Sequence, residues 1–196
     1  MNLANKLTLS RIFLTFVFMF FLVSRGVLAK ALALTVFIAA FVTDMLDGLI
    51  AKRANCVTDF GKLMDPIADK VLTLAAFLAF VEMELVPAWM VVIIMVREFS
   101  ITGLRILALG KGKVIAAGEG GRHKTVSQFI AISVVLIFLI LKEIGMKTGD
   151  FWNPQIERVW KDAIFLLMLF TMSLTLVSGI SYLAKHKELY LNAKAG

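Results

Sequence analysis

The stretch from Asp44 to Asp69 reads DMLDGLIAKRANCVTDFGKLMDPIAD and separates two apolar runs, residues 31–43 before it and residues 71–81 after it. Together with flanking residues, each run reaches the roughly 20 residues that a helix needs to cross a bilayer. The pattern therefore predicts two antiparallel membrane helices that are joined at a polar turn.

Four further apolar runs cover residues 12–23, 87–96, 126–141 and 163–177. The chain of 196 residues is 60% hydrophobic, whereas a soluble domain is about 45–50% apolar. Helices are expected because lipid cannot satisfy free backbone groups. The sequence thus predicts an all-α polytopic membrane protein, a six-transmembrane-helix bundle that forms a single domain over residues 1–196. Residues 142–161, with Gly145, Gly149 and Pro154, are expected to form an irregular loop.

Lysine and arginine are concentrated at both termini, between the second and third runs, and between the fourth and fifth runs. With six spans these segments share one side, which the positive-inside rule makes cytoplasmic. We therefore expect a multi-pass protein of the inner (cytoplasmic) membrane, with both termini and the active site facing the cytoplasm. The net charge of +7 is then explained by basic loops that face the anionic lipids of the cytoplasmic leaflet. No nucleic-acid partner is expected, because no basic stretch is interleaved with aromatic residues.

The acidic stretch carries its carboxylates at helical spacings. Asp44 and Asp47 are three apart and share one helix face, while Asp65 and Asp69 are four apart and share another. Four carboxylates in a poor dielectric need protonation or metal to cancel their charge. Oxygen ligands without Cys or His favour magnesium, manganese or calcium over zinc, and the number of carboxylates fits two ions. The alternative is that these acids simply reach for water at helix ends.

The spacing over residues 44–69 resembles the signature D-x2-D-G-x2-A-R-x8-G-x3-D-x3-D of the CDP-alcohol phosphotransferases, with every spacing intact. Lys52 stands where the family has arginine, and it keeps the charge without the bidentate fork. Shorter motifs at residues 5–11, 97–105, 121–125 and 177–182 are similar to those of the family members that use glycerol 3-phosphate.

This resemblance implies transfer of the phosphatidyl group of CDP-diacylglycerol to glycerol 3-phosphate, with release of CMP, within membrane lipid. It implies a divalent metal cofactor, with two ions of Mg²⁺ or Mn²⁺ bound. It also implies a homodimer. The implied metal ligands are Asp44, Asp47, Asp65 and Asp69. Asp69 is also the implied catalytic base.

The substrate contacts that we expect fall into two groups. The CDP-lipid would be contacted by Asn5, Thr8, Asp47, Gly48, Ala51, Lys52, Arg53 and Gly61. The phosphate of the acceptor needs a basic pocket, for which the expected residues are Arg97, Arg105, Arg122 and Lys124. The alternative for Arg97 is an ion pair with Glu98 or with a metal-site acid, and the alternative for Arg122 is a solvated loop charge.

Two other functions compete with this interpretation. One is a related enzyme that uses another acceptor, of the cardiolipin, inositol-phosphate or serine type. The other is a cation transporter with an intramembrane carboxylate site. The transporter is disfavoured because the aspartates are expected at a helix end rather than at the midplane, and no pair of broken helices is evident.

Overall fold

The computed structural model describes residues 3–51, 59–110, 119–149 and 152–187. Within these ranges only the backbone is described for residues 3–8, 44–51, 59–69, 109 and 119–123. The described chain forms α1 (Leu3–Val23), α2 (Val27–Ala51), α3 (Asp59–Glu82), α4 (Ala88–Gly110), α5 (Glu119–Thr148) and α6 (Pro154–Lys185). The all-α prediction is confirmed, and each predicted apolar run falls on one helix, the fourth beginning one residue before α4.

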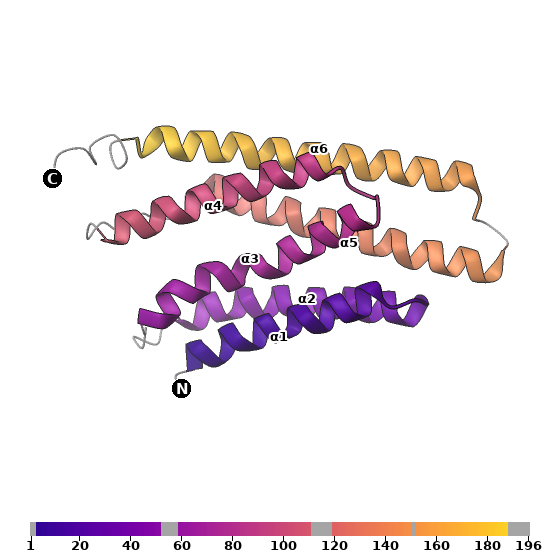
Figure 1. Cartoon of the computed structure of the whole chain (residues 1–196), viewed down its shortest axis with the longest axis horizontal. Helices are drawn as coiled ribbons and strands as arrows, with labels where there is room; N and C mark the ends of the chain where they lie inside the picture. The colour runs from indigo at the N-terminus through magenta and orange to yellow at the C-terminus, as the bar shows by residue number, and fades with distance from the viewer. Residues whose placement is uncertain (1–2, 52–58, 111–118, 150–151, 188–196) are drawn as a thin grey trace.

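The helices run back and forth along the long axis of the molecule (Figure 1). Helix α1 packs on α2 and α3, helix α4 packs on α3 and α6, and α5 contacts α2, α3 and α6. In Figure 1 the N-terminal end of α1, the C-terminal end of α2 and the N-terminal end of α3 lie at one end of the bundle. The C-terminal ends of α4 and α6 lie at that same end (Figure 1). The shared cytoplasmic side of the basic segments stays a prediction.

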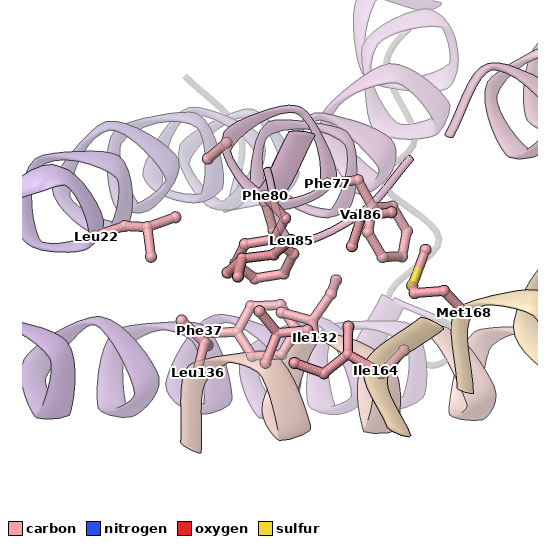
Figure 2. Close-up of a cluster of buried hydrophobic side chains, with 14 of the residues drawn as sticks. Leu22, Phe37, Phe77, Phe80, Leu85, Val86, Ile132, Leu136, Ile164 and Met168 are labelled. Atoms are coloured by element: carbon pink, nitrogen blue, oxygen red, sulfur yellow. The ribbon is translucent and has the colours of Figure 1, made fainter. Parts of the chain in front are cut away.

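The core lies where these helices meet, and large apolar side chains fill it. Phe37 of α2, Phe77 and Phe80 of α3, and Ile132 and Leu136 of α5 converge there (Figure 2). All five are at most 2% exposed. When helices associate in lipid, close packing of this kind drives the association instead of the hydrophobic effect.

The outer surface of the bundle is also apolar. Phe13, Phe16 and Phe20 on α1 are 67–70% exposed. Two helical spans, Lys124–Thr148 and Pro154–Lys185, are long and apolar enough to cross a membrane, yet only 39% and 33% of their most apolar windows are buried. A core helix of a soluble protein would be mostly buried. Exposed apolar surface of this extent indicates contact with lipid.

The predicted irregular loop over residues 142–161 is wrong. Helix α5 continues to Thr148 and α6 already begins at Pro154. Asn153 caps α6, because its Oδ1 accepts a hydrogen bond of 2.8 Å from the backbone N–H of Ile156. Proline in the first turn needs no hydrogen-bond donor, so Pro154 starts the helix rather than breaking it.

Contacts across this connection explain why both helices extend so far. Lys142 of α5 pairs with Glu157 of α6 at 2.8 Å, and Lys161 approaches the same carboxylate at 3.2 Å. Trp152 packs on Gly145, where an added methyl group would lie 2.5 Å from Trp152 Cβ. The glycine therefore provides space for a tryptophan instead of marking a loop.

Candidate active site

The backbone places the two predicted aspartate pairs near helix ends that share one end of the bundle (Figure 1). Asp44 and Asp47 lie in the last turns of α2, and Asp65 and Asp69 lie in the first three turns of α3. Their side chains are outside the part of the structure that is described. Their convergence on metal stays a prediction.

The side chains that are predicted to contact the CDP-lipid also lie outside the described part of the structure. Asn5 and Thr8 belong to α1, Gly48 and Ala51 to α2, and Gly61 to α3, each with only its backbone described. Lys52 and Arg53 lie outside the described residues. Among the described side chains no three from His, Cys, Asp and Glu come together as a metal site, a finding that does not bear on the four aspartates.

A buried ion cluster surrounds Glu98 of α4, whose side chain is 6% exposed. Lys70 Nζ of α3 lies 3.1 Å from Glu98 Oε2, and Lys124 Nζ of α5 pairs with Oε1. Arg97 Nη1 lies 3.3 Å from Oε1, and Gln128 Nε2 donates to the same oxygen at 3.4 Å. One carboxylate thus joins α3, α4 and α5 and faces three cations, so these four ionised side chains together carry a surplus of positive charge.

A cavity adjoins this cluster, and its lining is polar on one side and apolar on the other. Its charged lining comes from Arg11, Lys70, Glu98 and Lys124. The apolar wall includes Phe37 and Phe41 of α2. Thr125 and Gln128 add uncharged polar groups to the lining. A pocket with few convergent polar groups and apolar walls is typical of ligand sites.

The predicted acceptor residues divide into two sets. Lys124 lines the cavity, whereas Arg97 and Arg105 are outside its lining. Arg97 forms the ion pair with Glu98 and also donates through Nη2 to Ser178 Oγ of α6 at 2.9 Å. Arg105 Nε lies 3.4 Å from the hydroxyl of Tyr182. Arg122 belongs to α5, and its side chain is not described.

Sequence reasoning missed Lys70, Gln128 and the central place of Glu98. Lys70 follows the last aspartate directly, and Glu98 follows an apolar run and stands next to Arg97 in α4. An ionisable residue within such a helix is a signal of function in its own right. That signal could have identified Glu98, but not the helices from which its partners come.

Comparison with known proteins gives a consistent result over nearly the whole chain. Residues 1–183 match the sequence profile of the CDP-alcohol phosphatidyltransferase family. A Bacillus subtilis protein named CDP-diacylglycerol–glycerol-3-phosphate 3-phosphatidyltransferase is 38% identical, covering 95% of this chain and 96% of its own length. A probable phosphatidylglycerophosphate synthase of Mycobacterium tuberculosis is 33% identical over 94% of this chain and 81% of its own. A Rickettsia felis protein with the same name as the Bacillus one is 31% identical, at 96% and 97% coverage.

Proposed function

Because this chain belongs to the CDP-alcohol phosphatidyltransferase family, we infer that it transfers the phosphatidyl group of CDP-diacylglycerol to glycerol 3-phosphate. The products are phosphatidylglycerophosphate and CMP, and the reaction serves phospholipid biosynthesis. The observation that carries this function is similarity along nearly the full length to relatives named for that reaction. An acceptor that carries a phosphate also fits a cavity lined by Lys70 and Lys124.

We propose that the cavity beside Glu98 receives the phosphate of the acceptor. Lys70 and Lys124 line it from α3 and α5, and their ammonium groups would exchange part of their contact with Glu98 for contact with phosphate oxygens. Arg97 and Arg105 contribute positive charge from α4, and Arg122 would add to it from the start of α5. Charge-assisted hydrogen bonds of this kind are roughly twice as strong as neutral ones, which suits a small dianionic substrate.

The donor set at the ends of α2 and α3 fits a divalent cation. Asp44, Asp47, Asp65 and Asp69 offer only carboxylate oxygens, which suit Mg²⁺ or Mn²⁺. We propose that these four side chains hold two ions. When bound there, the ions supply charge neutralisation for the pyrophosphate of the CDP-lipid.

The reaction itself needs a proton acceptor. The hydroxyl oxygen of glycerol 3-phosphate forms a bond to the phosphorus that carries diacylglycerol, and the bond from that phosphorus to CMP breaks. We propose that Asp69 takes the hydroxyl proton, which requires hydrogen-bond reach of that hydroxyl. Asn5, Thr8, Gly48, Ala51, Lys52, Arg53 and Gly61 would surround the CDP group near the start of α1 and the turn between α2 and α3.

We propose that all six helices span the membrane, with the aspartate end of the bundle on the cytoplasmic side. The exposed apolar surface of α1, α5 and α6 supports lipid contact, and the distribution of basic residues supports the orientation. The acyl chains of the substrate would then remain in lipid while its nucleotide reaches water. A homodimer is proposed from the resemblance to the family.

Purified protein incubated with CDP-diacylglycerol and labelled glycerol 3-phosphate tests this function. The expected result is CMP release that depends on glycerol 3-phosphate, with the label in a lipid product. Parallel reactions with inositol phosphate, serine and phosphatidylglycerol test the related enzymes. CMP release with one of these acceptors, and none with glycerol 3-phosphate, would overturn the proposed acceptor.

A further inference from the structure

The C-terminal part of α6 carries a motif that the proposed reaction leaves unused, Ser178-Gly179 followed by Tyr182. These residues face α4, which packs directly on α6. Both α4 arginines meet this motif, Arg97 at Ser178 and Arg105 at Tyr182. Two arginines of α4 are thus held by side chains of the same stretch of α6.

Gly179 determines where Arg97 can lie. The side chain of Arg97 crosses the glycine so closely that an added methyl group would lie 2.5 Å from its Cγ and 3.1 Å from its Nε. Separations under about 3 Å are not found for real methyl carbons, and here the obstacle is the near part of the side chain rather than its free end. Any residue larger than glycine therefore displaces the guanidinium.

Ser178 fixes the direction in which the Arg97 guanidinium points. Its hydroxyl donates to the carbonyl of Thr175 at 3.1 Å and accepts from Arg97 Nη2 at 2.9 Å. The opposite nitrogen, Nη1, is thereby turned toward Glu98 Oε1 at 3.3 Å. Because Glu98 also holds Lys70 and Lys124, a continuous series of contacts runs from α6 to the cavity.

Tyr182 holds the second arginine in two ways. The guanidinium carbon of Arg105 lies 5.6 Å from the centre of the tyrosine ring, within the range of a cation–π contact. Arg105 Nε also lies 3.4 Å from the hydroxyl. The ring of His186 lies 4.5 Å from that of Tyr182 in a tilted arrangement, and this contact restricts the tyrosine.

We propose that Ser178, Gly179 and Tyr182 are positioning residues for the acceptor: they set the α4 arginines and, through Arg97 and Glu98, the cations of the cavity. This proposal rests on the proposed function, because it assigns α6 to the glycerol 3-phosphate side of that reaction. Helix α6 packs on α4 and α5, whereas the CDP-lipid side is expected on α1 to α3. The two substrates should therefore respond differently to changes in α6.

Steady-state kinetics of Gly179→Ala and Tyr182→Leu separate positioning from general support of the fold. Each variant should raise the KM for glycerol 3-phosphate about tenfold, because a displacement of about 1 Å is costly at a site that orients a substrate. The KM for CDP-diacylglycerol should stay within about twofold of wild type. Tyr182→Phe keeps the ring, so its KM for glycerol 3-phosphate should lie between those of the wild type and Tyr182→Leu.

Ser173→Thr is the matched control, because it adds one methyl group at an exposed position of the same helix and keeps the hydroxyl that bonds Leu169. It should leave both KM values unchanged. If the KM for glycerol 3-phosphate is unchanged in both Gly179→Ala and Tyr182→Leu, the proposal is overturned. Equal losses toward both substrates would overturn it in favour of a purely structural role. If the wild-type protein releases no CMP with glycerol 3-phosphate, the proposed function itself is refuted instead.

Discussion

Replacing Glu98 by glutamine tests whether one carboxylate holds the buried cations together. Glutamine keeps the shape of the side chain, but it removes the negative charge that lies 3.1 Å from Lys70 Nζ and 3.3 Å from Arg97 Nη1. It also removes the charge that pairs with Lys124. The side chains of Glu98, Arg97 and Lys124 are only 6%, 9% and 9% exposed, so water replaces the lost partner only in part.

The size of the effect follows from this burial. Removing one partner of a buried ion pair costs about 3–5 kcal/mol, since a charge is left in the interior without compensation. In a protein of this length each kcal/mol corresponds to a shift in Tm of about 2–4 °C. Glu98→Gln should therefore lower the Tm by about 6–20 °C, measured by the loss of helical circular dichroism of the protein in detergent micelles.

Glu157→Gln is the matched control at the other end of the bundle. Glu157 also faces two lysines, at 2.8 Å and 3.2 Å, but its side chain is 25% exposed and that of Lys161 is 47% exposed. Exposed pairs contribute about 0–1 kcal/mol each, so the loss of both should lower the Tm by less than about 8 °C and by less than Glu98→Gln does. If the two variants melt within about 2 °C of each other, the carboxylate of Glu98 does not carry the stabilising role assigned to it.

Three further predictions concern the reaction, and CMP release measures each of them. Asp69→Asn should lower kcat by about 10²–10⁴-fold, the usual contribution of a general base, and activity above about a tenth of wild type would remove Asp69 from that role. Arg105→Ala should raise the KM for glycerol 3-phosphate more than the KM for CDP-diacylglycerol, whereas equal changes would argue against an acceptor site there. Chelation by EDTA should stop turnover and added Mg²⁺ or Mn²⁺ should restore it, and turnover that survives chelation would contradict the metal-ligand role of the four aspartates.

The sequence predicted the helices well because each one contains a long apolar run, and the length of such a run is a strong signal. It failed over residues 142–161, where glycine and proline were interpreted as breakers of helices. Gly145 instead accommodates Trp152, and Pro154 occupies the first turn of α6. Both outcomes depend on contacts between α5 and α6, which local propensity does not contain.

The candidate site was predicted only in part, for a related reason. The sequence predicts that Arg97 and Lys124 contact the phosphate of the acceptor, and it offers an ion pair with Glu98 as the alternative for Arg97. Glu98 as the shared partner of Lys70 and Lys124 was not foreseen. Those contacts depend on how α3, α4 and α5 are rotated about their axes where they meet, and apolar runs this continuous leave that rotation undetermined.

Because α5 and α6 are long, a label at their shared tip can show which side of the membrane that end of the bundle faces. With 30 and 32 residues, they measure about 45 and 48 Å at 1.5 Å per residue, against about 30 Å of hydrocarbon. They reach past α1, α2 and α3 at the end opposite the chain termini (Figure 1). Met146, near that tip, is 68% exposed, and Cys56 is the sole cysteine of the chain. With the orientation proposed above, a Met146→Cys substitution in a Cys56→Ser background would expose one thiol to a maleimide that cannot enter intact cells.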